Sequence, residues 1–174
     1  ARSDNPSIKH YLSNYGFVPL WVLNNILTFG VISKFYSLMK QPERQFVAKK
    51  FHMTEDNLES ALFYISKVRN FCAHGNRLYC FRNNFPYADT KHHSNMNIPQ
   101  ITKNGGKEYQ FGKRDVFAAM LIFKDLLPNK EFFALLNRIE QILNHLYKKL
   151  NVLTQQDILD SLGFPPDWKT LLQK

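Results

Sequence analysis

Cysteine is scarce in this chain. Two cysteines among 174 residues, Cys72 and Cys80, are too few for a disulfide framework, and no second pair completes a zinc site. We therefore expect a reducing, cytoplasmic setting. The sequence also lacks a phosphate-cradling glycine loop, a nucleophile elbow and a pair of catalytic carboxylates, so no cofactor is predicted.

Long apolar runs are missing as well. The most apolar segment, from Phe17 to Ile32, is too short for a membrane span and is interrupted by Asn24, Asn25 and Gly30. The first four residues lack the apolar core of a signal peptide. We expect no membrane association, and a buried core helix across the apolar segment.

Acidic residues are outnumbered by basic ones. The chain has 23 Lys and Arg against 14 Asp and Glu, for a formal net charge of +9. This balance favours a polyanionic partner, nucleic acid before others. With 44% hydrophobic residues, 15 of them Phe, the chain can also bury a substantial core.

Hydrophobic periodicity predicts helices nearly throughout, and thus an all-α helical bundle in one domain over residues 1–174. Thr54 has the character of an N-cap, followed by acidic residues that suit a first turn. Gly163 ends a short helix over residues 154–162. The expected helices cover about residues 8–15, 20–40, 42–51, 54–77, 113–127, 132–150 and 154–162, with a last turn near 168–171.

Residues 79–112 lack this periodicity and predict an irregular insertion. Ile101 and Tyr109 flank Asn104-Gly105-Gly106, the signal of a small β-hairpin. Basic residues mixed with aromatic ones suit single-stranded RNA, because bases stack on rings while phosphates meet cations. A loop that its aromatic residues anchor to the core explains the same pattern equally well. The residues concerned are Arg82, Lys103 and Lys107 with Phe85, Tyr87 and Tyr109.

The run Lys91-His92-His93 raises the question of a metal site. Neighbouring histidines point in different directions, and no carboxylate or cysteine lies at ligand spacing. We predict no metal there and expect a polar loop.

The helix that follows Thr54 has two faces on a helical wheel. Leu62, Ile65 and Cys72 lie within about 40° of Leu58 and predict the core side, with Arg69 among them. An arginine there needs an acceptor or a route to water, so it is expected to snorkel. Asn70, His74 and Arg77 form a second, polar stripe at i, i+4 and i+7.

The run Val68-Arg69-Asn70-Phe71-Cys72-Ala73-His74-Gly75-Asn76-Arg77-Leu78-Tyr79 resembles the signature of Abi-like proteins, which belong to the HEPN superfamily. The superfamily is marked by Arg, a polar residue and then His, here Arg69-Asn70-x3-His74. Further likeness lies in Ile8-Lys9-His10-Tyr11, Pro19-Leu20-Trp21, Phe29-Gly30 and Phe35-Tyr36, so that it covers residues 7–82. Gly75 stands where the family often has a second His, and Tyr79-Cys80-Phe81-Arg82 replaces a shorter Trp-Asn-Arg ending. Abi-like proteins are usually longer, so the chain is expected to be the C-terminal part of one.

This resemblance implies a HEPN-like fold and metal-independent cleavage of RNA, in phage defence by abortive infection or as a toxin. His74 would transfer protons, since imidazole titrates near neutrality. Arg69 would hold a phosphate oxygen and stabilise charge in the transition state. Asn70 would bind phosphate or orient His74. The predicted RNA-binding residues are Arg77, Arg82, Lys103 and Lys107.

Arg69 and His74 leave a regular helix about 140° apart, which hinders their convergence within one chain. Either the helix distorts near Gly75, or two copies combine their residues as HEPN domains of similar type do. We predict a homodimer with a composite site, with the side of Phe63 and Asn70 toward the partner. An RNA or protein antitoxin is a further candidate partner. The alternatives are a non-catalytic RNA-binding module and a protein-interaction module.

Overall fold

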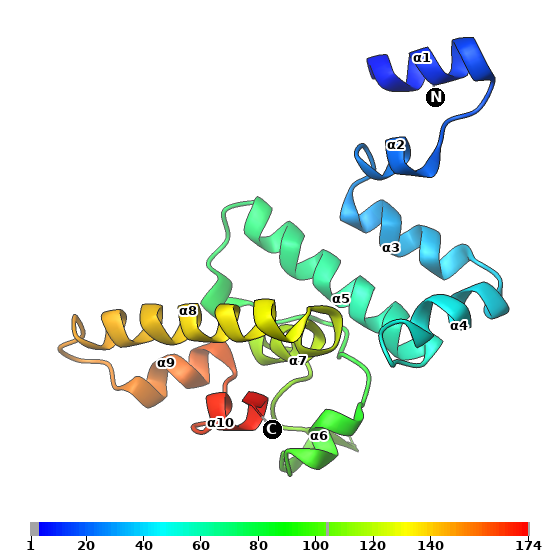
Figure 1. Ribbon diagram of the computed structural model, residues 1–174. Coiled ribbons are helices and arrows are strands. Elements are labelled where there is room, and N and C mark those ends of the chain that lie inside the picture. The colour runs from blue at the N-terminus through cyan, green and yellow to red at the C-terminus, as the bar shows by residue number, and fades with distance from the viewer. Residues whose placement is uncertain (1–3, 104, 174) are drawn as a thin grey trace.

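The computed structural model of the protein describes residues 4–103 and 105–173. Over these residues the chain forms ten α-helices, one 3-10 turn and one two-stranded hairpin, which confirms the predicted all-α fold with a small β-hairpin (Figure 1). None of these helices combines the length and the hydropathy that crossing a bilayer requires. In chain order the elements are α1 Pro6–Tyr15, α2 Leu20–Asn24, α3 Phe29–Leu38, α4 Gln41–Lys49, α5 Glu55–Ala73, η1 Leu78–Cys80, α6 Lys91–Asn95, β1 Gln100–Lys103, β2 Gly106–Tyr109, α7 Val116–Leu126, α8 Asn129–Tyr147, α9 Gln155–Leu162 and α10 Trp168–Gln173.

Helix α7 is the centre of the hydrophobic core. Every residue from Val116 to Ile122 is buried, so the helix is covered on all sides over its first two turns. Helix α5 contributes Ala61, Ile65 and Val68 to the same core. Helices α8, α9 and α10 complete it from the C-terminal part of the chain (Figure 1). The core therefore joins elements from both halves of the sequence.

A buried carboxylate, that of Asp115, marks the start of α7. Its side chain accepts hydrogen bonds from the backbone N–H of Ala118 at 3.0 Å and of Gly112 at 3.1 Å. The hydroxyl of Tyr64, on α5, donates to the backbone oxygen of Asp115 at 2.8 Å. Burial raises the pKa of the Asp115 carboxyl to about 6. Four segments thus meet here, since Gly163 at the end of α9 lies directly against this side chain.

The predicted helix over residues 20–40 is wrong, because the chain breaks between α2 and α3. Asn25 ends α2, and the Thr28 side chain caps α3 by accepting from the Val31 N–H at 3.4 Å. Such local side-chain bonds compete with helix continuation, and periodicity does not reveal them.

The predicted burial of residues 17–32 is also wrong. Helix α1 has no buried residue, and the Trp21 side chain is 63% exposed. Figure 1 shows α1 and α2 leading away from the body, to which α3 is joined through α5. Val22 is buried in this segment, whereas Phe17, Leu20 and Trp21 are each more than half exposed.

The approach of Gly163 to Asp115 gives a first prediction. A Cβ at Gly163 would lie 2.2 Å from that of Asp115, and φ at Gly163 is +72°. Gly163→Ala should therefore lower the free energy of unfolding by about 3 kcal/mol, through left-handed strain and overpacking together.

Gly75→Ala is the matched control, to be followed with Gly163→Ala in urea unfolding. Gly75 has a similar φ of +71° but nothing within 4 Å of its Cβ position. Strain alone should then cost about 1 kcal/mol. Equal losses in the two variants would contradict the close packing of α9 on Asp115.

The raised pKa of Asp115 gives a second prediction. The folded state holds the proton more tightly than the unfolded chain, so this group's stabilising contribution is complete below about pH 4 and is lost as pH rises through about 6. Between pH 4 and 7 the unfolding free energy of the parent, minus that of Asp115→Asn, should fall by on the order of 2 kcal/mol. Urea unfolding across this range measures the difference, and a flat difference would refute the assignment.

Candidate functional site

Helix α5 ends in a Schellman motif at the predicted active residues. Thr54 caps its start, as predicted, by accepting from the Asn57 N–H at 3.2 Å. At the other end the N–H of Asn76 donates to the oxygen of Phe71, and that of Gly75 to the oxygen of Cys72. The helix therefore stops at Ala73, with His74 as its C-cap, and the predicted end near Arg77 is wrong.

Arg69 and Asn70 are both exposed at this end of α5. The guanidinium of Arg69 donates from Nη1 to Oδ1 of Asn70 at 3.1 Å. The exposure of Arg69 agrees with the expected route of its guanidinium to water. The prediction that Cys72 lies on the core side is wrong, because Cys72 is exposed. Phe71 is the last residue of α5 that packs against the core, and the end of the helix lies at the periphery of the molecule (Figure 1).

His74 and Arg77 are exposed as well. The His74 ring has no hydrogen-bond partner among the described residues, so both ring nitrogens are available to a ligand. Arg77 donates from Nη1 to the hydroxyl of Tyr79 at 3.5 Å. Because α5 is helical without interruption through Ala73, Arg69 and His74 leave it about 140° apart, as in a regular helix.

A polar groove of about 680 Å³ runs between α3 and α5 and reaches Asn70. Lys34 and Lys67 line it together with Phe63, and the Lys67 ammonium lies 4.9 Å from the centre of the Phe63 ring. The sequence analysis did not identify these lysines as site residues, since nothing in the spacing of α3 indicates that Lys34 faces α5. Asp56 and Glu59 line the groove as well, so its charge is mixed.

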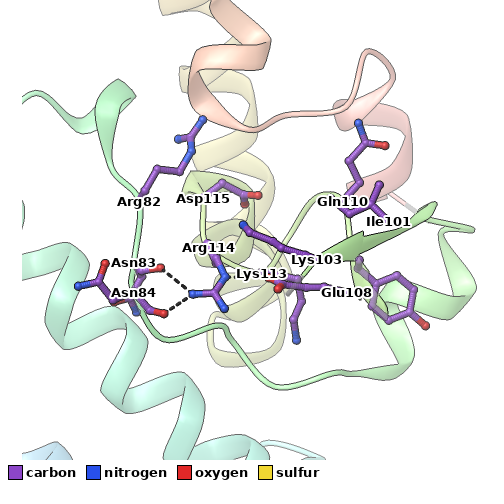
Figure 2. Close-up of a pocket in the computed structure, with 11 residues that line it drawn as sticks. Arg82, Asn83, Asn84, Ile101, Lys103, Glu108, Gln110, Lys113, Arg114 and Asp115 are labelled. Atoms are coloured by element: carbon purple, nitrogen blue, oxygen red, sulfur yellow. Dashed lines mark hydrogen bonds and ion pairs between the residues drawn. The ribbon is translucent and has the colours of Figure 1, made fainter. Parts of the chain in front are cut away.

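A second hollow, of about 520 Å³, lies in the insertion (Figure 2). Arg82 and Lys103, two of the predicted RNA-binding residues, line it together. Lys107 lines the adjoining hollow, which also includes Lys103. Arg69, His74 and Arg77 are not among the lining residues, so the predicted site residues form two groups.

Ion pairs already engage part of the positive charge in this insertion. Arg114 binds Glu108 at 2.8 Å and donates to the backbone oxygens of Asn83 and Asn84. Lys113 pairs with Asp89 at 2.6 Å. Arg82 donates to two backbone oxygens. Lys103 and Lys107, by contrast, form no ion pair within the described part of the chain.

The two histidines of the insertion are buried anchors, so the predicted polar loop at residues 91–93 is wrong. Nε2 of His92 lies 2.7 Å from a carboxylate oxygen of Asp125 on α7. His93 is fully buried, with Nε2 2.9 Å from the oxygen of Gly112. Desolvation lowers the pKa of His93. No group of three or more metal-ligating side chains occurs in residues 4–103 and 105–173.

The first 80 residues match the model of a known family, described as Abi-like protein. The match agrees with the resemblance seen in the sequence, and it contains α1 to α5 with Arg69, Asn70, His74 and Arg77. The insertion, with Arg82, Lys103 and Lys107, lies outside it. Neither the curated proteins nor the solved structures contain a match to this chain.

The His92–Asp125 contact gives a third prediction. The variant His92→Ala leaves the largely buried carboxylate of Asp125 without its partner, which should lower the free energy of unfolding by about 2 kcal/mol. His145→Ala, at an exposed position on α8, is the control and should change stability little. Chemical denaturation of the three proteins measures this, and equal stabilities would show that the insertion is not anchored through His92.

Proposed function

We propose that this chain is a metal-independent endoribonuclease of the HEPN type, acting in abortive infection against phage or as a toxin. The observation that carries the proposal is the exposure of Arg69, Asn70 and His74 together at the end of α5, within the segment that matches the Abi-like family. Three polar groups suited to phosphate chemistry are thus presented to solvent. The net charge of +9 favours RNA as the ligand.

The proposed reaction is transesterification within the RNA strand. The 2′-oxygen attacks the neighbouring phosphorus as its proton is removed, and the bond from phosphorus to the 5′-oxygen breaks as that oxygen gains a proton. His74 transfers these protons. Arg69, oriented by its bond to Asn70, stabilises the phosphorane charge. The products are a 2′,3′-cyclic phosphate and a 5′-hydroxyl.

The proposed active form is a homodimer. Since Arg69 and His74 leave α5 about 140° apart, one phosphate is more readily reached by Arg69 of one copy and His74 of the other. Around them Phe63 is 39% and Tyr79 46% exposed, which gives a second copy apolar surface to cover. The reaction would take place in the cytoplasm, where an RNA or protein antitoxin would restrain it.

One observation favours a second candidate function, a non-catalytic RNA-binding module. The unpaired lysines of the insertion, Lys103 and Lys107, offer phosphate contacts that need no chemistry at α5. This candidate predicts salt-sensitive binding of RNA without strand scission.

The nuclease proposal predicts that His74→Ala and Arg69→Ala each lower the rate of RNA cleavage by at least about 100-fold with folding intact, since proton transfer and charge stabilisation are lost. The assay follows labelled RNA in excess chelator and identifies the product ends. His145→Ala and Arg138→Ala, at exposed positions on α8, are the controls. Cleavage by the His74 and Arg69 variants at the parental rate would refute the proposal.

Mixing the two inactive variants tests the composite site. If subunits pair at random, half of the dimers combine the two variants. Each mixed dimer has one intact site of two, with Arg69 from one copy and His74 from the other, so about a quarter of the parental activity should return. No recovery in a mixture that exchanges subunits would rule out a site built from Arg69 of one copy and His74 of the other.

A further inference from the structure

The N-terminal part of the chain presents apolar side chains that the proposed reaction does not use. Helices α1 and α2, here called the N-terminal arm, lead away from the body of the molecule (Figure 1). The two helices pack on each other, because the rings of Tyr11 and Trp21 meet edge to face with their centroids 5.7 Å apart. Leu20 is nevertheless 76% exposed, and Tyr15, Phe17 and Trp21 are each more than half exposed. The arm therefore offers an apolar surface of defined shape.

A second apolar surface lies on α3, to which the arm is attached. Val31, Phe35 and Leu38 stand at i, i+4 and i+7 and so share one face of the helix, and each is about half exposed or more. On a regular helix they lie about 100–160° from Tyr36. Tyr36 is buried and donates to the backbone oxygen of Glu55 on α5. This face, here called the α3 stripe, is therefore turned away from α5.

We propose that the N-terminal arm docks on the α3 stripe of a second copy of this chain, while the arm of the second copy docks on the α3 stripe of the first. Such an exchange covers both apolar surfaces of both copies in one two-fold dimer. The inference deepens the proposed function by naming the surface through which the two copies pair. It rests on that function only for the role of the dimer in RNA cleavage.

The distribution of charge favours a second copy over other occupants of these surfaces. From His10 to Ser33 the sequence contains no Asp, Glu, Lys or Arg, although the net charge of the chain is +9. Two such chains repel each other, so an uncharged surface is where they approach most easily, and interface cores are depleted of charged residues. RNA needs cations for its phosphates, and helices that lie on a membrane usually carry Lys and Arg on their polar face. The segment supplies neither.

The area of the two surfaces is sufficient for a stable dimer. The exposed leucine, valine and aromatic side chains of the arm and the α3 stripe together offer on the order of 1,000 Å² per copy. A standard interface takes about 800 Å² from each partner. Trp21 and Tyr15 also belong to the residue types that contribute most to binding energy at interfaces.

The position of the arm connects this interface with the proposed site. The N-terminal half of α3 lies beside the C-terminal part of α5, since Gly30 and Asn70 line the same groove. The arm, which precedes α3, therefore leaves the body near the end of α5 that carries Arg69 and Asn70. A second copy held by the arm lies on the side of the molecule where a composite site requires it.

Sedimentation velocity on the full chain, over a wide range of protein concentrations, tests the interface. Leu20→Glu places a carboxylate on the arm, and Leu38→Glu places one on the α3 stripe. Both side chains are largely exposed in the single copy, so neither change disturbs its core. Ile142→Glu, at a more than half exposed apolar position on α8, is the matched control. Circular dichroism and thermal unfolding show that each variant is folded.

We expect the parent to dimerise, with a dissociation constant that rises at least about tenfold in each of the two variants, since a carboxylate is costly to bury in an apolar contact. Ile142→Glu should dimerise like the parent. Dimerisation of the parent should strengthen as salt is added, because screening weakens the repulsion between two chains of charge +9.

Mixing the two variants tests the exchange of arms. The mixed dimer keeps one of its two contacts, that of the intact arm of Leu38→Glu with the intact stripe of Leu20→Glu. Dimerisation should therefore be stronger in the mixture than in either variant alone. No recovery in the mixture would refute the docking of arm on stripe.

Three further outcomes would overturn the proposal. The parent stays monomeric at every concentration, both variants dimerise like the control, or the parent floats with vesicles of phosphatidylcholine and phosphatidylglycerol without dimerising. RNA cleavage is measured separately on the same proteins. A dimer that depends on Leu20 and Leu38 but cuts no RNA refutes the nuclease and keeps the interface. Cleavage by a dimer that neither variant weakens keeps the nuclease and refutes the interface.

Discussion

The arrangement of this fold depends on the buried carboxylate of Asp115. Asp115 caps the central helix α7 and accepts a hydrogen bond from the N–H of Gly112. Gly163 at the end of α9 packs against its side chain, and the Tyr64 hydroxyl of α5 donates to its backbone oxygen. A charge in that position is costly to bury, and its backbone donors offset the cost only in part, as the raised pKa shows. Because four segments share one small group, their relative placement is closely determined.

The two predicted functional regions differ in how their side chains are held. At the end of α5, the side chains are exposed and held by few contacts, apart from the Arg69–Asn70 bond. In the insertion, the side chains are fixed by buried histidines and by ion pairs. The first arrangement leaves its side chains accessible to a ligand, and the second holds its side chains rigidly in place.

The features that depend on residues next to one another in the chain could be predicted from the sequence. The Thr54 cap, the end of α9 at Gly163 and the hairpin at residues 101–109 all follow from residues next to one another in the chain. The exposure of Cys72 could not be predicted in this way, because a helical wheel assumes that one face meets the core along the whole helix, whereas at this end of α5 Phe71 packs against the core. The burial of His92 and His93 depends on Asp125 and Gly112, far along the chain, and the break before Thr28 depends on a cap within an apolar stripe. The roles proposed for Arg69, Asn70 and His74 depend on the family resemblance, because geometry alone does not assign them.

The end of the family match at residue 80 does not coincide with the end of a unit that packs its own core. The match ends at residue 80, yet the face of α5 that bears Ala61, Tyr64 and Val68 is covered by α7, which lies beyond that point. A chain cut there would lose the cover of these side chains and the acceptor of the Tyr64 hydroxyl. The helix with the recognisable signature is therefore stabilised by sequence that carries no such signature. A fragment that carries this signature therefore needs another element in the place of α7 to cover the same face of α5.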